Sequence, residues 1–270
     1  MYGDQILGKL QRVAIVVNAT KSGALPFARE LAIRFEKQGI GAQILAKYPI
    51  DENIFDRVDM ITTVGGDGTL LGIAAMATKF EISVFAVNHG EVGFLSTIAR
   101  EHALQQIENL KTSKFRLSER LMLAINLNEM RYLALNDVVV RSKNCARLTK
   151  LTAIFNGNLI AEYRADGVMV SSPTGSTAYN FSAGGPITHP NLDCMIFTPI
   201  CQHGCNAYSL VLPASGSLVL TAEKGDEFAV YCDGNPTGCA SEVIVSAFEK
   251  KLKLMEIEGL SFFDILRKKL

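Results

Sequence analysis

A strand, a glycine turn and a helix follow one another without a break at residues 60–80, and this pattern constrains the fold more than any other. Met60–Val64 is a short apolar run with β-branched residues, which is typical of a buried strand. The turn Gly65–Gly68 follows at once, and the apolar segment at residues 70–80 is long enough for a helix. Such a unit predicts main-chain N–H groups at a helix start, beside a turn that phosphate oxygens can approach closely.

Strand and helix patterns alternate over the first 110 residues. We expect strands at residues 13–18, 42–46, 59–64 and 82–88, and helices at residues 25–38, 70–80 and 100–110. Repeated βα units predict a parallel sheet with helices on its faces, and such sheets bind ligands beyond the carboxyl ends of their strands. Asn18, Gly65–Gly68 and Asn88–Gly90 all fall at this edge, so we expect a site there.

From about Leu121 the pattern changes to short runs of strand length, separated by Gly, Pro, Asn and Ser. These runs are rich in β-branched and aromatic residues and occupy residues 121–127, 132–140, 151–157, 159–164, 167–171, 209–213, 217–222, 227–232 and 242–248. Asn156-Gly157 predicts a two-residue hairpin turn. Residues 259–270 return to a helical pattern, which we expect to pack back on the first domain. This half of the chain is therefore predicted to be mainly β.

Composition narrows the class of protein. Hydrophobic residues make up 48% and charged residues 20% of the 270 residues, which describes a globular protein with a substantial core. Lys plus Arg equals Asp plus Glu at 27 each, which disfavours nucleic-acid binding through a general basic field. No apolar run approaches the length of a membrane span, and the first residues lack the design of a signal peptide. We expect a cytoplasmic protein without nucleic-acid or membrane partners.

The cysteines do not form a recognisable metal site. All six lie in the second half of the chain: Cys145, Cys194, Cys201, Cys205, Cys232 and Cys239. Two of them flank His203, but a second pair of ligands at zinc-binding spacing is missing. We therefore expect free thiols in a reducing compartment and no metal on cysteine.

Asp67 needs an explanation, because a carboxylate inside this turn repels a phosphate. It makes sense if it binds a metal ion, or if it takes a proton from a hydroxyl that attacks the phosphate, and both point to phosphoryl transfer. The simpler alternative is an ordinary turn whose aspartate caps the helix. No G-x-x-x-x-G-K-[ST] motif occurs, and Gly72 lies one place too late for G-x-G-x-x-G.

Residues 165–190, ADGVMVSSPTGSTAYNFSAGGPITHP, form a second informative stretch. A strand-like run leads into a loop dense in glycine and hydroxyl side chains, which can wrap the polar edges of a ligand. Tyr179 offers an aromatic face for a base, and Asp166 can accept hydrogen bonds from a ribose or an amide. The alternative is a Ser/Thr/Gly-rich loop in which Ser176 or Thr177 caps a short helix.

Together these stretches resemble the NAD kinase family over nearly the whole chain. The family's motifs correspond to Gly65–Thr69 (GGDGT), Asn88–Leu95 (N-x-G-x-x-G-F-L), Glu119–Leu123 (E-R-x-M-L), Asn136-Asp137 (Asn-Glu/Asp), Ser172–Tyr179 (T-P-T-G-S-T-A-Y) and Ala183–Pro186 (A-G-G-P). Two departures are Ser172, where threonine is usual, and residues 204–209, which replace the family's pattern after His203.

This resemblance implies an α/β plus β architecture. Residues 1–118 would form a Rossmann-like α/β domain with a parallel sheet, joined by residues 253–270, and residues 119–252 a β-sandwich-like domain that binds NAD. The implied reaction transfers the γ-phosphoryl group of ATP to the 2′-hydroxyl of the adenosine ribose of NAD. The resemblance also implies Mg²⁺ or another divalent metal, and a homo-oligomer, a dimer or a tetramer.

The resemblance assigns roles to residues as well. Asp67 would be catalytic, as a base toward the 2′-hydroxyl or as a metal ligand, and no other protein metal ligand is assigned. Donor phosphates would lie on Gly66, Gly68 and Thr69. The dinucleotide would contact Asn136 and Asp137 near its ribose or adenine. Thr177, Ala178 and Tyr179 would shape an adenine pocket that Phe94 lines, and Asp166 and Ser182 would lie on the nicotinamide side. Asn88, Ser176 and Asp233 are further binding residues. Arg164 is a candidate phosphate partner, with a surface salt bridge as its alternative.

Two other functions stay open from the sequence. The GGDGT turn is shared with diacylglycerol and sphingoid lipid kinases, although this chain shows no basic amphipathic helix for a membrane surface. A pyridine-nucleotide sensor without turnover is the second alternative, and the intact Asp67 disfavours it.

Overall fold

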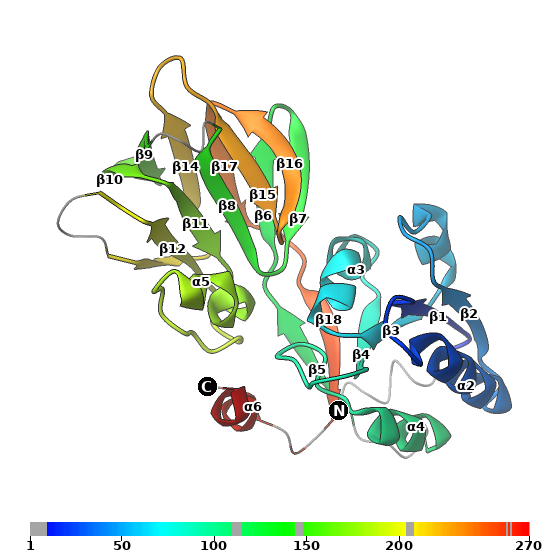
Figure 1. Ribbon diagram of the computed structural model, residues 1–270. Coiled ribbons are helices and arrows are strands. Elements are labelled where there is room, and N and C mark those ends of the chain that lie inside the picture. Colours follow the sequence, from blue (N-terminus) through cyan, green and yellow to red (C-terminus); the bar gives the residue numbers. More distant parts are fainter. Residues whose placement is uncertain are drawn as a thin grey trace. The chain divides into compact units, whose positions relative to one another are not determined.

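The computed structural model describes residues 10–109, 115–143, 148–203, 208–257, 259 and 261–269. The chain divides into two compact units (Figure 1). The first unit comprises Met1–Glu119 together with Leu252–Leu270, and the second comprises Arg120–Lys251. The predicted fold class is confirmed, since an α/β unit with a parallel sheet is followed in sequence by a β-rich unit.

A six-stranded sheet forms the centre of the first unit. Its order is β2-β1-β3-β4-β18-β5, with β2 Gly41–Leu45, β1 Arg12–Val17, β3 Met60–Gly65, β4 Ser83–Asn88, β18 Leu252–Ile257 and β5 Phe115–Arg120. The pairs β1–β2, β1–β3, β3–β4 and β4–β18 are all parallel. The first four strands were predicted within a residue or two, because each is a short β-branched run next to a turn signal.

Helices cover both faces of this sheet, as βα units require. Figure 1 shows α2 (Ala24–Lys37) and α4 (Arg100–Glu108) on one side, and α3 (Asp67–Lys79) on the other. Helix α2 buries Phe27, Leu31 and Phe35, which recur every four residues, against the alternate side chains of β1. It ends before Gly39, whose φ of +78° suits a residue without a Cβ. A short 3₁₀ helix, η1 (Glu52–Arg57), precedes β3.

Strand β18 was not predicted. Its segment reads LKLMEI and pairs with β4, whose residues lie about 170 positions earlier in the chain. Leu252, Leu254 and Met255 are at most 2% exposed, so the strand is buried inside the sheet rather than at its edge. A pairing over so long a separation leaves no local signal. Helix α6 (Phe262–Lys269) follows it, where a helical pattern was expected.

The second unit contains two antiparallel sheets of six strands that enclose one apolar core. The β6 sheet has the order β10-β9-β14-β17-β6-β7, with β10 Asn158–Ala165, β9 Thr149–Phe155, β14 Ser217–Ala222, β17 Glu242–Ala247, β6 Leu123–Leu127 and β7 Met130–Ala134. The β8 sheet has the order β13-β12-β11-β8-β15-β16, with β13 Leu210–Pro213, β12 Cys194–Ile200, β11 Gly167–Ser171, β8 Asp137–Ser142, β15 Phe228–Cys232 and β16 Asn235–Ala240. Alternate residues of both sheets share the core, as in a β-sandwich.

Two predictions for this unit need correction. The run at residues 132–140 was expected as one strand, but it is divided between β7 and β8, which belong to different sheets, and the chain crosses at Leu135-Asn136. Strand β12 was missed because it contains Pro199. That proline is tolerated because β13 pairs only with Cys194–Phe197, so no partner on that side needs its N–H.

The predicted hairpin turn of this unit is confirmed. The turn Asn156-Gly157 joins β9 to β10, with φ of 49° and 79° as a two-residue hairpin requires. Residues 172–192 form an irregular segment with a 3₁₀ turn, η2 (Thr174–Thr177), and a short helix, α5 (Tyr179–Ser182). Among the described residues, no helix is long and apolar enough to cross a membrane.

Candidate active site

The first cluster of predicted site residues lies at the carboxyl ends of β1, β3 and β4. Main-chain hydrogen bonds tie the loops after these strands together, from Asn18 N to Val64 O (3.0 Å) and from His89 N to Gly65 O (2.7 Å). Strand β1 lies between β2 and β3, so the strand order reverses here, and α2 and α3 leave toward opposite faces. Ligands of open α/β sheets bind at such a reversal. The loops after β1, β3 and β4, called the rim below, therefore lie together at the edge where ligands of such sheets bind.

Asp67 is the first residue of α3, and its carboxylate holds the loop after β4. Its Oδ2 accepts the N–H of Phe94 (2.9 Å), and its Oδ1 accepts those of Leu95 (3.2 Å) and Ser96 (2.8 Å). The helix is preceded by Gly66 and has no side-chain cap, so the alternative that Asp67 caps its own helix is wrong. A carboxylate offers about four acceptor positions, and three are occupied here. The remaining position is on Oδ2.

The glycines of the rim differ in whether packing requires them. A Cβ on Gly93 would lie 2.0 Å from Oδ1 of Asp67, and one on Gly65 would lie 2.0 Å from Oγ1 of Thr69. These two positions therefore exclude any side chain. A Cβ on Gly68 would meet nothing within 4 Å, although it is the second residue of α3. Packing among the residues that the structure describes does not explain a glycine at position 68.

Other predicted residues of this cluster shape the rim. Asn88 ends β4 and is 3% exposed, and its side-chain amide donates to the carbonyl of Glu91 (2.6 Å). Thr69 is 6% exposed, and its hydroxyl has no hydrogen-bond partner among the described residues. Phe94 is half-buried and contacts Asp67 through its main chain. Ligand contacts of these three side chains stay predictions.

The second cluster lies in the second unit, where the chain crosses between its two sheets. The carboxylate of Asp233, in the turn between β15 and β16, accepts the N–H groups of Leu135 (2.8 Å), Asn136 (2.7 Å) and Asp137 (3.1 Å). Asp233 has a φ of 47°, which aspartate tolerates better than most residues. This turn thereby holds the Asn136-Asp137 motif in place.

The Ser172–Tyr179 motif holds the same crossing from its other side. Ser172 N donates to the carbonyl of Asn136 (2.8 Å), and the Ser172 hydroxyl donates to the carbonyl of Leu135. A Cβ on Gly175 would lie 2.1 Å from the carbonyl oxygen of Asn136, so only glycine fits. The hydroxyl of Ser172 also accepts the N–H of Gly175 (3.1 Å), so serine performs this task where the family usually has threonine.

Asp137 is an unusual carboxyl group. It is 6% exposed and lies on the outer face of the β8 sheet, because Val138 and Val140 beside it point into the core. Burial, and then the nearby carboxylate of Asp233, raise the pKa of Asp137 to about 7. Burial also raises the pKa of Asp233, against the effect of its three main-chain hydrogen bonds. Perturbed carboxyl groups of this kind are typical of functional sites.

The loop at residues 172–192 is held by its own buried polar groups. The Ser176 hydroxyl donates to the carbonyl of Pro173 (2.7 Å) and accepts the N–H of Thr188 (3.1 Å). Asn180, which sequence reasoning missed, donates to the carbonyls of Ser176 and Pro186 and accepts from Thr198. Both side chains are fully buried, so the structure gives Ser176 a role in the loop, and its ligand contact stays a prediction. No side chain caps α5, so the helix-cap alternative is not supported.

Tyr179 offers an aromatic surface at this cluster and is 36% exposed. Arg141, from the end of β8, lies over its ring at 5.7 Å and donates to its hydroxyl. Arg141 was not predicted, because one arginine at a strand end carries no signal in a sequence. Asp137 and Arg141 share the outer face of β8 and lie roughly 14 Å apart along the strand. Thr177 and Ala178, before Tyr179, are half-buried.

Three predicted residues are exposed without a side-chain partner that the structure identifies. Arg164 and Asp166 lie where β10 turns into β11, and their main chains bond to His203 and Ile200. Ser182 ends α5. Among the described residues, no group of three or more His, Cys, Asp or Glu side chains could hold a metal ion. Cys145 and Cys205 lie outside the described residues.

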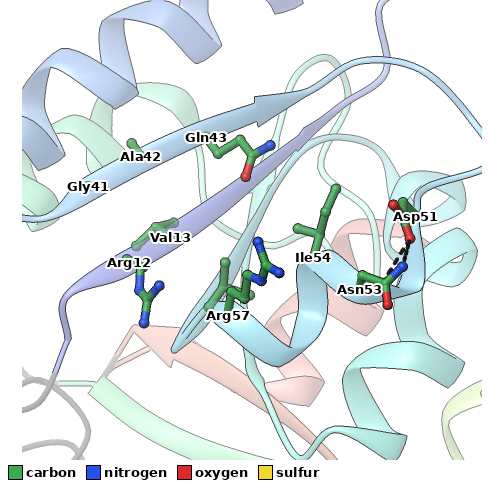
Figure 2. A pocket seen from close by; sticks show the side chains of 10 residues that line it. Arg12, Val13, Gly41, Ala42, Gln43, Asp51, Asn53, Ile54 and Arg57 are labelled. Atoms are coloured by element: carbon green, nitrogen blue, oxygen red, sulfur yellow. Dashed lines mark hydrogen bonds between the residues drawn. The ribbon is translucent and has the colours of Figure 1, made fainter.

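A pocket of about 570 Å³ opens elsewhere on the first unit (Figure 2). It is lined by the first residues of β1 and β2 and by η1, including Arg12, Gln43, Asn53 and Arg57. These strand starts lie at the opposite edge of the parallel sheet from Asp67, so the pocket is separate from the rim.

Comparisons with known proteins match both parts of the chain. The models of the ATP-NAD kinase N-terminal and C-terminal domains match residues 46–115 and 135–256. An NAD kinase of Heliobacterium modesticaldum is 35% identical over 96% of this chain and 98% of its own. An NAD kinase of Symbiobacterium thermophilum is 32% identical over 97% of this chain and 99% of its own.

Two solved structures share the fold. Yeast NADH kinase complexed with NADH has a TM-score of 0.80 at 22% identity, covering 96% of this chain and 86% of the yeast chain. An NAD kinase from Archaeoglobus fulgidus in complex with ATP has a TM-score of 0.79 at 23% identity, covering 96% of this chain and 98% of the archaeal chain.

Proposed function

We propose a role for each part of this chain, which belongs to the NAD kinase family and is an ATP-dependent NAD kinase. In the proposed reaction, the 2′-oxygen of the adenosine ribose of NAD forms a bond to the γ-phosphorus of ATP. The bond from that phosphorus to the β–γ bridging oxygen breaks, the hydroxyl proton is lost, and the products are NADP and ADP. The observation that carries the proposal is Asp67, which lies at the rim with one acceptor position left on Oδ2.

The donor phosphates are assigned to the start of α3. The N–H groups of the first turn of a helix favour anions, and Gly66 and Gly68 let phosphate oxygens approach the main chain. Gly68 supports this assignment, because no contact among the described residues requires a glycine there. Thr69 follows in the same turn of the helix.

Asp67 is assigned to the attacking hydroxyl. Phosphoryl transfer asks a protein mainly to position two substrates and to balance charge. A carboxylate fixed by three main-chain N–H groups is held in one orientation, and its free Oδ2 position can accept the proton of the 2′-hydroxyl. The same carboxylate keeps the loop at residues 94–96 in place, so it has a structural role as well.

The dinucleotide is assigned to the second unit. Asn136 and Asp137 would bind ribose or adenine, and Asp233 supports this by holding their main chain. The aromatic face of Tyr179 suits a base. Five further residues complete the assignment, as partners of the adenine pocket, the nicotinamide side and a phosphate: Thr177, Ala178, Asp166, Ser182 and Arg164.

A divalent ion, Mg²⁺ by the resemblance, would be held mainly by the donor phosphates. The oxygen atoms that the protein offers fit this arrangement, because Mg²⁺ keeps few protein ligands and Asp67 has only one acceptor position left. When bound, the ion supplies neutralisation of charge on the phosphoryl group.

The test is production of NADP from NAD, ATP and Mg²⁺ by the purified chain. NADH is tested beside NAD, since the yeast relative was solved with NADH. Reactions without ATP and with Asp67→Asn are the controls. ATP-dependent product that Asp67→Asn reduces by several orders of magnitude, with NAD binding retained, supports the proposal.

Other results would point elsewhere. NAD binding by a folded protein without product would favour the sensor alternative, and a lipid-phosphorylation assay would then follow. Near wild-type turnover of Asp67→Asn would contradict the role of this carboxylate. The oligomer, a dimer or a tetramer, stays a prediction, which light scattering would measure. The cytoplasmic location also stays a prediction.

A further inference from the structure

We propose that Lys21 binds the donor triphosphate and is a further substrate-positioning residue at the rim. The proposal rests on the proposed function, because it assumes that donor phosphates lie at the start of α3. Lys21 lies three residues after Asn18, which the sequence pattern places at this edge. No predicted motif contains Lys21.

The position of the ammonium group carries the proposal. Nζ of Lys21 would be 3.3 Å from a Cβ built on Gly66, and also 3.3 Å from one built on Gly90. It donates a hydrogen bond to the carbonyl of His89 (3.0 Å). Lys21 belongs to the loop after β1, Gly66 follows β3, and His89 and Gly90 follow β4. One ammonium thus lies where three loops of the rim meet.

This ammonium has capacity left for a ligand. An ammonium has three N–H donors, and the hydrogen bond to His89 uses one of them. Within the described part of the chain, no carboxylate lies within salt-bridge distance of Lys21. The side chain is half-buried, so two donors and a full positive charge remain at the rim.

The topology explains why a cation here would meet phosphates. The loops that contain Lys21 and Gly66 leave the neighbouring strands β1 and β3 for opposite faces of the sheet. The helix start beyond Gly66 attracts anions, and a lysine ammonium acts as a compact point charge toward phosphate oxygens. Glycine at positions 66 and 90 leaves the ammonium uncovered, since a side chain at either position would be in close contact with it.

Lys21→Gln tests the proposal, because it removes the charge and keeps a hydrogen-bond donor for His89. We expect the KM for ATP, and the inhibition constant of inorganic tripolyphosphate, to rise about tenfold or more, as for loss of a charged hydrogen bond. The KM for NAD should change less than twofold. Lys21→Arg should recover most of the ATP affinity. Lys37→Gln, at the exposed far end of α2, is the matched control and should behave as wild type.

The outcomes separate the possible failures. An unchanged KM for ATP in an active Lys21→Gln variant overturns the proposal and leaves the kinase function standing. Equal increases in the KM values of ATP and NAD, together with a lower melting temperature, would mean that Lys21 only ties the loops together, which also overturns it. Absence of NADP formation by the wild type is a failure of the proposed function itself.

A measurement on the wild-type protein covers the case in which Lys21→Gln does not fold. Acylation of lysines by an amine reagent, followed by mass spectrometry, reports the accessibility of each ammonium. ATP and tripolyphosphate should each protect Lys21 several-fold, whereas NAD should not, and Lys37 should react equally throughout. Unprotected Lys21 at saturating ATP would overturn the proposal.

Discussion

Single residues at the rim combine a structural task with the chemical one that we propose for them. Asp67 uses three of its acceptor positions to hold the main chain of residues 94–96, and Gly93 is needed because Oδ1 of Asp67 occupies the space of its missing side chain. Substitution of Asp67 by asparagine therefore changes more than charge, because its NH₂ group would oppose a main-chain N–H. Hydrogen exchange of the main-chain amides of residues 94–96 in Asp67→Asn would distinguish a loss of order in this loop from a loss of the carboxylate's proposed action on the hydroxyl.

Gly68→Ala should affect the stability of the protein and its binding of ATP in opposite directions. A Cβ at this helical position meets no atom within 4 Å, so alanine should raise the free energy of unfolding by about 0.5–1 kcal/mol. If phosphates approach the main chain there, the same methyl group should raise the KM for ATP severalfold. Gly72→Ala, on the exposed side of the same helix, should stabilise without a kinetic effect. Unchanged kinetics of Gly68→Ala would place the phosphates elsewhere.

Asp137 should make stability depend on pH in a definite direction. Its folded pKa of about 7 exceeds the usual value of 3.8, so the folded protein binds more protons between about pH 4 and pH 7. The free energy of unfolding should therefore fall as pH rises through this window and level off above it. In Asp137→Asn, this decrease in the free energy of unfolding should be smaller by about 2–4 kcal/mol, because each unit of pKa difference between the folded and unfolded states corresponds to roughly 1.4 kcal/mol.

Urea denaturation at pH 5 and pH 8 would check the pH dependence. Asp226→Asn, in an exposed turn, is the control. Equal pH dependence in wild type and Asp137→Asn would contradict the raised pKa.

At the scale of elements, the crossing between β7 and β8 depends on a turn far away in sequence. Asp233→Ala would leave the N–H groups of Leu135, Asn136 and Asp137 without their acceptor. We expect a loss of about 2–5 kcal/mol in stability, since each unsatisfied buried donor costs about 1–3 kcal/mol. NAD affinity should fall with it, because the Asn136-Asp137 main chain loses its support. Amide exchange at residues 135–137 would show the effect directly, with Asp226→Ala unchanged.

At the scale of the whole molecule, the end of the chain completes the first unit. Removal of residues 252–270 would delete β18 from between β4 and β5 and expose β4. The three buried apolar side chains of β18 contribute about 2 kcal/mol each, a sum comparable to the stability of a whole domain. We expect the first unit of this truncated chain not to fold.

A shorter truncation provides the comparison. Removal of residues 261–270 deletes α6 and keeps β18, so the parallel sheet should persist. Circular dichroism and proteolysis would compare the two chains. A folded first unit in the chain that ends before residue 252 would contradict the role assigned to β18.

The sequence by itself determined the features whose signals are local. The βα units, the Gly65–Gly68 turn, the hairpin at Asn156-Gly157 and the change from α/β to β follow from hydrophobic period and turn chemistry within a few residues. The family followed from motifs in a fixed order, and it located Asp67 and the Asn136-Asp137 pair. Arg141 and Lys21 carried no such signal.

The tertiary structure alone decided what depends on contacts between distant segments. It placed β18 beside β4, divided residues 132–140 between two sheets, and showed that Asp233 and Ser172 hold that crossing from both sides. It also showed Asp67 bonded to a loop 27–29 residues away, Ser176 turned inward, and the ammonium of Lys21 at the rim. The physical reason is that strand pairing, burial and charge act through space, whereas periodicity and turn propensity act only along the chain.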